Sequence, residues 1–125
     1  MQKHAILAVP FAMAAFAPLA TLSARPNSPE RPAAFGVCAG CHSVESGKSS
    51  FGPNLSGVFG RKAGSLPGYA YSDALKSSGY TWNAKTLDEW LRSPRKAVPG
   101  SKMPFNGYAD PATRRQVIQY LEELK

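Results

Sequence analysis

The two cysteines of the chain stand three positions apart, and a histidine follows the second directly, giving Cys38-Ala39-Gly40-Cys41-His42. This five-residue pattern is typical of haem c attachment. Two thiols at this spacing can each add to one vinyl group of a porphyrin, while the neighbouring imidazole reaches the iron. A chain with this motif is therefore expected to fold around a large, flat, mostly apolar ring.

Three other interpretations of the cysteine pair are possible. It could form a simple disulfide, or a thioredoxin-like redox pair, but the latter follows a strand and needs no histidine, and no strand pattern precedes Cys38. A zinc site would need a fourth ligand, and the only other histidine is His4, near the start of the chain. Haem attachment is the interpretation that these observations favour.

The first residues are typical of an export signal rather than of a folded domain. A short polar start with Lys3 leads into an almost wholly apolar run over residues 5–22, and small residues follow before Arg25. We predict a signal peptide over residues 1–24 and a single domain over residues 25–125. A retained membrane anchor is the alternative, although two prolines interrupt the run.

The chain is basic, with 15 Lys and Arg against 8 Asp and Glu and a formal charge of +7 over 125 residues. Removal of residues 1–24 would take away only Lys3 and leave 14 basic residues against 8 acidic ones, a charge of +6. Such a surplus can attract acidic proteins, nucleic acid or anionic membranes. We find no nucleic-acid-binding motif, and charge alone is weak evidence for one.

The first two thirds of the domain predict few regular elements. Pro32 is suited to the first turn of a short helix over residues 33–41. Residues 43–78 are rich in Gly, Ser and Pro without sustained periodicity, so loops are expected there, with one short helix over residues 72–77.

Two clearer helices are predicted downstream. Thr86 is the expected N-cap of the first, which Pro94 would end. Asp110 is the expected N-cap of the second, with Pro111 at its first position and an apolar stripe of Val117, Ile118, Leu121 and Leu124. No strand pattern persists, so the predicted fold class is all-α with extensive loops.

Beyond the haem motif, the sequence closely resembles the class I cytochromes c, of the mitochondrial cytochrome c and bacterial cytochrome c2 type. The resemblance covers nearly all of residues 34–124. The motifs that carry it, in the family's order, are Phe51-Gly52-Pro53-Asn54-Leu55, Phe59-Gly60-Arg61-Lys62-Ala63-Gly64, Pro67-Gly68-Tyr69, Tyr71-Ser72-Asp73-Ala74, Thr81-Trp82 and Pro99-Gly100-Ser101-Lys102-Met103-Pro104-Phe105.

The resemblance implies short helices and loops wrapped around one covalently bound haem, with His42 and Met103 as axial ligands of the iron. Met103 is the one methionine outside residues 1–24. A lone methionine usually fills core space, but this one lies in a loop and matches the family's ligand position. With both axial positions filled, the implied function is not enzymatic. It is the carriage of one electron at a time between respiratory or photosynthetic redox complexes.

The resemblance also implies the surroundings of the haem. The carbonyl group of Pro53 would accept a hydrogen bond from His42. The haem propionates would be bound by Arg61, Tyr71, Ser72, Trp82 and Ser101. Without the resemblance, an isolated Arg or Ser would be interpreted as a solvated surface group, and Trp82 as part of the core.

The sequence departs from mitochondrial relatives near the expected haem. Trp90 and Leu75 stand where those relatives have a tyrosine and an asparagine, so we expect a changed polar network and a shifted reduction potential. Phe35 and Gly36 are out of the register that pairs the first helix with the last, which leaves the packing of that helix open.

Five cations lie on segments that surround the exposed haem edge in the resembled fold: Lys48, Lys62, Arg95, Lys96 and Lys102. They are expected to steer acidic redox partners, with quinol:cytochrome c oxidoreductase as donor and a terminal oxidase or reductase as acceptor. We expect a periplasmic monomer that contacts a membrane only if the leader is retained. A peroxidase-like haem enzyme is the alternative if Met103 is not on the iron.

Overall fold

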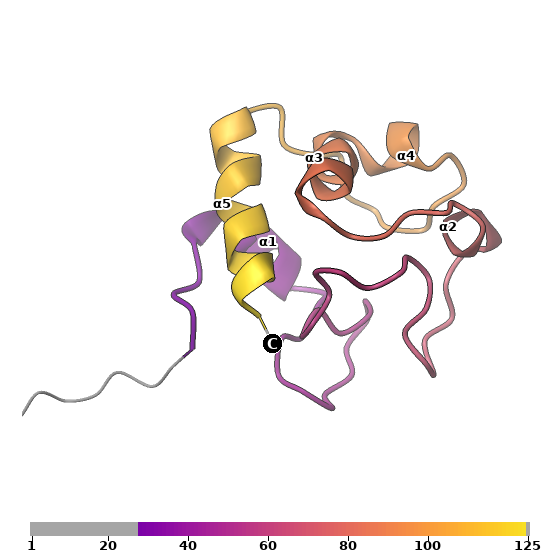
Figure 1. The fold of residues 1–125 in the computed structure, drawn as a ribbon, viewed down its shortest axis with the longest axis horizontal. Helices are drawn as coiled ribbons and strands as arrows, with labels where there is room; N and C mark the ends of the chain where they lie inside the picture. The colour runs from indigo at the N-terminus through magenta and orange to yellow at the C-terminus, as the bar shows by residue number, and fades with distance from the viewer. Residues whose placement is uncertain (1–27, 125) are drawn as a thin grey trace, which may run out of the picture.

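The computed structural model describes residues 28–124, so the predicted leader over residues 1–24 lies outside the described residues. The described part is helical, as predicted, with long loops between the helices (Figure 1). Its one extended pairing is an isolated bridge between Lys62 and Thr81. None of the described helices is long and apolar enough to span a bilayer. The helical elements are η1 Ala33–Phe35, α1 Gly36–Ala39, α2 Asp73–Lys76, α3 Ala84–Arg92, α4 Pro94–Ala97 and α5 Pro111–Glu123.

Helix α5 begins as its sequence predicts. Asp110 caps it by accepting a hydrogen bond from the backbone N–H of Thr113 at 2.8 Å, and Pro111 occupies the first turn. The apolar stripe of α5 is buried, with Val117 fully enclosed. This helix packs against α3, and the two form the helical wall of the molecule (Figure 1).

Helix α3 starts earlier than predicted, because its N-cap is Asn83 and not Thr86. The Asn83 Oδ1 atom accepts from the backbone N–H of Thr86 at 3.0 Å, and the Thr86 Oγ1 atom accepts from the backbone N–H of Asn83 at 2.9 Å. This reciprocal pair is a capping box, in which Thr86 is the third helical residue. The helix ends at Arg92, and Pro94 opens the separate turn α4.

The predicted helix over residues 33–41 is divided into the short turn η1 and the single turn α1. Its packing, which the sequence left open, rests on Phe35: the side chain is 1% exposed, and its ring meets that of Tyr120 edge to face at 4.8 Å. The Tyr108 hydroxyl donates to the carbonyl oxygen of Ala34 at 2.5 Å. These contacts hold the start of the domain against α5 (Figure 1).

The loops over residues 43–71 form the other side of the molecule, opposite α3 (Figure 1). They are joined to the helices at defined points. The backbone N–H of Gly57 donates to the carbonyl oxygen of Leu124 at 3.2 Å, next to the end of α5. Ser72 caps the short helix α2, close to where the sequence predicts it, by accepting from the backbone N–H of Leu75.

Candidate functional site

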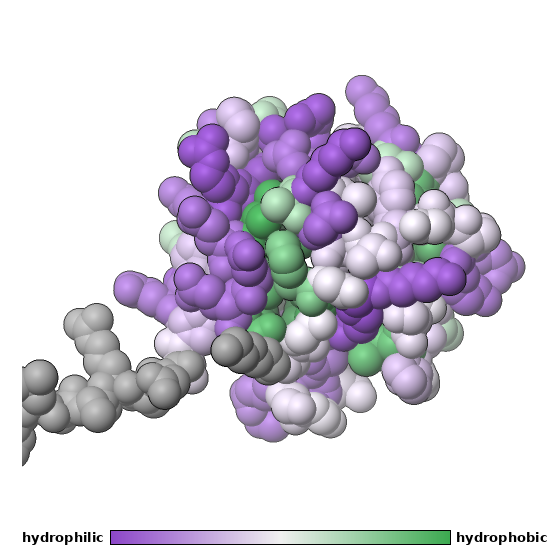
Figure 2. Space-filling model, in the orientation of Figure 1, coloured by the Kyte–Doolittle hydropathy of each residue, from purple (hydrophilic) through white to green (hydrophobic). Residues whose placement is uncertain are grey.

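A cavity of about 530 Å³ lies between the helices and the loops. This volume is within the range of small-molecule and cofactor sites, which are mostly apolar. Figure 2 shows apolar surface in the middle of the face seen in Figure 1, with polar side chains on either side. All ten residues predicted to contact the cofactor line this one cavity: Cys38, Cys41, His42, Pro53, Arg61, Tyr71, Ser72, Trp82, Ser101 and Met103.

The Cys-x-x-Cys-His segment forms a tight turn at the end of α1. The backbone N–H groups of Cys41 and His42 both donate to the carbonyl oxygen of Cys38, at 3.0 and 2.9 Å. The two thiols are not joined in a disulfide. Burial raises the pKa of the Cys38 thiol, whereas thiol redox proteins lower the pKa of their reactive cysteine. This environment argues against the thioredoxin-like alternative.

The imidazole of His42 is contacted by two neighbouring residues, Pro53 and Gly52. Its Nδ1 atom lies 2.7 Å from the carbonyl oxygen of Pro53, the contact that the resemblance implies. Burial lowers the pKa of His42, and the bond to Pro53 opposes that effect only in part. The ring is therefore neutral at neutral pH, with Nδ1–H donating to Pro53 and Nε2 left as a metal-ligating atom.

Gly52 completes the support of this ring. A Cβ atom at position 52 would lie 2.5 Å from His42 Cε1 and 2.7 Å from His42 Nδ1, so only a glycine allows the backbone to pass this close. The backbone N–H of Gly52 donates to the carbonyl oxygen of Cys41 at 2.6 Å. The sequence alone does not reveal this role of Gly52, and the one signal for it is the place of the glycine directly before Pro53 in the Phe51-Gly52-Pro53 motif.

Met103 reaches the cavity from the loop that follows α4. Its side chain is half-buried. The backbone N–H of Ser101 donates to the carbonyl oxygen of Val98 at 3.1 Å, and that of Phe105 to Met103 at 2.9 Å, so the loop is ordered on both sides of the methionine. The cavity thus has a histidine from the start of the domain and a thioether from a segment far along the chain.

Two buried polar atoms in the cavity have no hydrogen-bond partner among the described residues: Nε of Arg61 and Oγ of Ser101. The other Arg61 nitrogens are satisfied, Nη2 by the carbonyl oxygen of Asn54 at 2.8 Å and Nη1 by that of Ser56 at 3.3 Å. Buried donors without a partner are costly and rare. An acidic group in the cavity would satisfy both, so the lining fits a haem with its propionates.

The remaining predicted contacts differ in how they are engaged. Ser72 Oγ accepts the capping bond from Leu75 at 3.1 Å and keeps its own hydrogen to donate. Burial raises the pKa of the Tyr71 hydroxyl, an effect that the nearby Arg61 reduces. Trp82 is 7% exposed and packs against Trp90 with ring centroids 5.4 Å apart, so its core role and its place in the cavity are compatible.

The two positions that depart from mitochondrial relatives, Leu75 and Trp90, also line the cavity. Of the five predicted partner-binding cations, all are exposed, but only Lys102 lines the cavity. Lys48 is paired with Glu45, three positions earlier on the same loop. The other three exposed cations, which do not line the cavity, are Lys62, Arg95 and Lys96.

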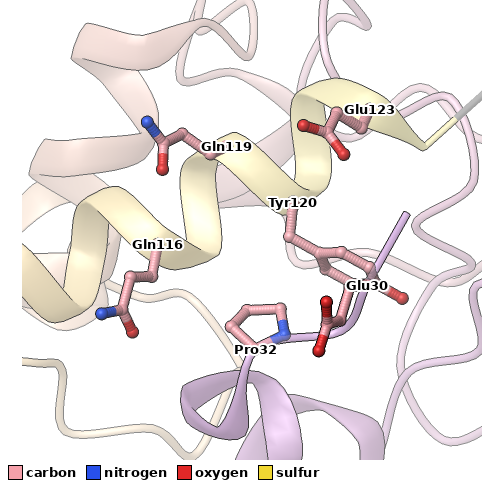
Figure 3. Close-up of a pocket in the computed structure, with 6 residues that line it drawn as sticks. All are labelled: Glu30, Pro32, Gln116, Gln119, Tyr120 and Glu123. Atoms are coloured by element: carbon pink, nitrogen blue, oxygen red, sulfur yellow. The ribbon is translucent and has the colours of Figure 1, made fainter.

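A second, shallower pocket of about 280 Å³ contains none of the predicted site residues. Figure 3 shows it between α5 and the segment before η1, with the Tyr120 side chain projecting from the helix. The part of the chain that the structure describes holds no group of three metal-ligating acidic, histidine or cysteine side chains, here or elsewhere. The residues that line this second pocket are Glu30, Pro32, Gln116, Gln119, Tyr120 and Glu123.

A small helical domain around a cofactor-sized cavity, with a Cys-x-x-Cys-His turn on its wall, defines a c-type haem protein. Comparison with known proteins agrees, since the family model "Cytochrome c" matches residues 33–125. Cytochrome c2 iso-2 of Magnetospirillum fulvum is 50% identical over 95 residues, which are 76% of this chain and 99% of that protein. Cytochrome c of Arabidopsis thaliana is 47% identical over 87 residues, 69% of this chain and 78% of that protein.

The fold comparison gives the same result. The structure of cytochrome cH from Methylobacterium extorquens is similar with a TM-score of 0.68 and 50% identity, covering 71% of this chain and 90% of that chain. The chain therefore belongs to the cytochrome c family. Its cofactor is one covalently attached haem c, and it is a single-haem electron-transfer protein rather than an enzyme.

Proposed function

We propose that Cys38 and Cys41 would attach the haem and that His42 and Met103 would be the two protein ligands of its iron. The observation that carries this proposal is the 2.7 Å contact between His42 Nδ1 and Pro53, which orients the imidazole in a cavity that both cysteines and Met103 also line. When bound, the haem supplies an iron that cycles between Fe(II) and Fe(III). Two protein ligands leave no coordination position for a substrate.

The protein's own residues set how readily the electron is accepted. The neutral imidazole of His42 and the soft thioether of Met103 together favour Fe(II), which gives a higher potential than two stronger donors would give. The bond from His42 to Pro53 makes the imidazole more basic and lowers that potential to some extent. The backbone hydrogen bonds of the turn after Cys38 and of the loop around Met103 would hold both ligands in place when the charge of the iron changes.

We assign the cavity's polar side chains to the propionates. Arg61 Nε and Ser101 Oγ are buried donors without another partner. Ser72 has a hydroxyl hydrogen to donate, and Tyr71 and Trp82 line the same cavity. A cation and several donors compensate for the desolvation of buried carboxylates.

The proposed setting is the periplasm, reached through removal of residues 1–24, with retention as a membrane anchor the alternative. There the exposed cations Lys48, Lys62, Arg95, Lys96 and Lys102 would steer acidic redox proteins into brief encounters. Quinol:cytochrome c oxidoreductase as donor and a terminal oxidase or reductase as acceptor are the partners we propose. The carrier would act as a monomer.

The optical spectrum of the protein, produced in a host that matures cytochromes c, tests the ligand assignment. We expect a covalent low-spin haem with the weak long-wavelength band of iron–sulfur ligation, and loss of that band in Met103→Ala. A matched control is Leu55→Ala, which shortens another half-buried side chain of the cavity and should keep the band. Absence of the band in the native protein, or its persistence in Met103→Ala, would overturn Met103 as ligand.

A further inference from the structure

Three aromatic side chains stand in series at the wall of the haem cavity: Trp90, Trp82 and Tyr80. The ring centroids of Trp90 and Trp82 are 5.4 Å apart, and those of Trp82 and Tyr80 are 5.9 Å apart. Both tryptophans are buried and line the cavity, whereas Tyr80 is only half-buried and lies outside the cavity lining. We call these three residues the aromatic row. It leads from the cavity towards the surface.

Two backbone segments set the spacing of the aromatic row. Tyr80 and Trp82 flank Thr81, which forms the isolated bridge with Lys62, and side chains two positions apart in an extended segment point to the same face. The carbonyl oxygen of Tyr80 and the N–H of Trp82 each form a backbone hydrogen bond with the segment that contains Lys62, at 2.8 and 2.9 Å. Trp90 comes from α3. The three rings are therefore held by ordered backbone.

The hydroxyl at the outer end of the aromatic row contacts a base. The Tyr80 hydroxyl donates to Oε2 of Glu89 at 3.3 Å. The hydroxyls of Tyr69 and Tyr108 donate instead to backbone carbonyl oxygens, which accept a hydrogen bond but do not take up the proton. Burial raises the pKa of the Tyr80 hydroxyl, and Glu89 raises it further. The phenol therefore keeps its proton at neutral pH.

Edge-to-face aromatic pairs are ordinary core packing, and the pair of Phe35 and Tyr120 is explained in that way. The aromatic row differs from such a pair in two respects. Its inner rings line the cavity of a redox cofactor, and its outer ring carries a hydroxyl whose proton has a carboxylate to go to. Indole and phenol are also among the side-chain groups most easily oxidised by one electron. A phenol gives up its electron more readily when a positioned base takes its proton.

We propose that Tyr80 passes an electron along the aromatic row to Trp82 or Trp90 after a strong one-electron oxidant, such as a peroxyl radical, has oxidised that tryptophan. The oxidant gains one electron and becomes an anion, which leaves an indole radical cation. Tyr80 then gives one electron to the indole and its hydroxyl proton to the Glu89 carboxylate. The products are an intact tryptophan, a neutral tyrosyl radical and a protonated Glu89. The aromatic row thus moves oxidative damage away from the haem cavity.

The composition of the chain allows the reaction to be started at a known place, because Trp82 and Trp90 are its only tryptophans. Pulse radiolysis of an azide solution produces the azide radical, which oxidises indole faster than phenol at neutral pH. The test uses the holoprotein in the Fe(III) state, so that the iron has no electron to give to the indole radical. Absorbance follows the indole and tyrosyl radicals, and electron paramagnetic resonance of freeze-quenched samples identifies them.

In native protein we expect the tyrosyl radical to form as the indole radical decays, at a rate that does not depend on protein concentration. Tyr80→Phe keeps the ring but should lose this tyrosyl signal and prolong the indole radical. Tyr69→Phe, which removes a hydroxyl that donates to a backbone carbonyl, is the matched control and should behave like native protein. Glu89→Gln keeps an oxygen acceptor but no base, and should slow formation of the tyrosyl radical about a hundredfold.

Two results would overturn the proposal. Formation of the tyrosyl radical at the native rate in Tyr80→Phe would assign the electron to another tyrosine. A native rate in Glu89→Gln would show that Glu89 is not the proton acceptor. Native protein and all three variants should share one haem spectrum and one reduction potential. If Tyr80→Phe alters the spectrum, Glu89→Gln decides, because it leaves all three rings in place.

This inference goes beyond the proposed function and can fail without it. The radical measurements depend on neither Met103 as a ligand nor any partner protein. Loss of the aromatic row would leave the iron–sulfur band of the native protein in place. Absence of that band, in turn, would leave the transfer from Tyr80 to the tryptophans unchanged.

Discussion

The backbone of Gly52 and the imidazole of His42 lie so close that no side chain fits between them. A Cβ atom on residue 52 would meet three ring atoms of His42, at 2.5, 2.7 and 3.0 Å. We predict that Gly52→Ala displaces the ring from its bond to Pro53 and lowers the free energy of unfolding of the holoprotein by about 2 kcal/mol, as overpacking does. Denaturant unfolding, followed through the haem absorbance, measures this loss.

The matched control for that substitution is Gly36→Ala. A Cβ atom at position 36 would have nothing within 4 Å, and the residue has helical backbone angles, φ −54° and ψ −39°. The same added methyl group should leave stability unchanged or raise it by about 0.5 kcal/mol, because alanine restricts the unfolded chain. Equal stability of Gly52→Ala and Gly36→Ala would contradict the role given to Gly52.

Ser101→Ala distinguishes a propionate donor from an idle hydroxyl. The Ser101 Oγ atom is buried and has no partner among the described residues, so its removal from a cavity without an acceptor would be neutral or stabilising. If Ser101 binds a propionate, the variant should lose about 1 kcal/mol of holoprotein stability. Ser65→Ala is the control, because its exposed hydroxyl donates only to Lys62 at 2.6 Å, and it should change little.

Asp88 should stabilise the folded protein at neutral pH, and this stabilisation should be lost in acid. The bond to Arg114, 2.7 Å from Nε to Oδ1, holds the pKa of Asp88 below its ordinary value of 3.8. The stabilisation is therefore complete above pH 3.8 and is lost as the pH falls through the lower, folded-state pKa. Asp88→Asn should cost about 2 kcal/mol at pH 7, because it leaves the buried Arg114 guanidinium without its carboxylate.

Below about pH 4 the stability difference between native protein and Asp88→Asn should shrink. Thermal unfolding at a series of pH values measures it. The control is Asp73→Asn, whose carboxylate is 97% exposed and pairs with Lys76; little change is expected at any pH. A difference between native protein and Asp88→Asn that is constant from pH 7 to 3 would rule out the ion pair as its origin.

Leu75→Asn restores a polar group beside the cavity where mitochondrial relatives have one. Leu75 is half-buried and lines the cavity. An amide dipole there should stabilise the more highly charged Fe(III) state and lower the reduction potential, since the apolar shell around a metal tunes its potential. Voltammetry of the two proteins tests this, and an unchanged potential would contradict it. Leu87→Met, which keeps the cavity apolar, is the control.

Features that depend on local chemistry could be predicted from the sequence. The Asp110-Pro111 start of α5 is one, because cap and first turn are set by neighbouring residues. The start of α3 could not be fixed in the same way. Asn83 and Thr86 are both good caps three positions apart, and the capping box uses them together, with Asn83 outside the helix.

The sequence predicted residues that line the cavity, but not all of the contacts that position them. The spacing of Cys38, Cys41 and His42 directly predicts these three residues as the haem-attachment motif. Arg61, by contrast, is positioned by the backbone carbonyl groups of Asn54 and Ser56. Every residue has a backbone carbonyl group, so the sequence does not show which of these groups accepts a hydrogen bond. Such contacts can be assigned only from the conformation of the loop.

The hydrogen bond between Tyr108 and Ala34 joins residues 74 positions apart. The ring contact between Phe35 and Tyr120 also joins segments that are distant in the sequence. The segment that leads into the haem-attachment turn therefore obtains these packing partners from residues far downstream in the sequence. Contacts of such long sequence separation form slowly, because a long loop must close first. Since α5 packs against η1, we expect the two thiols to stay accessible for haem attachment until α5 has folded onto the start of the domain.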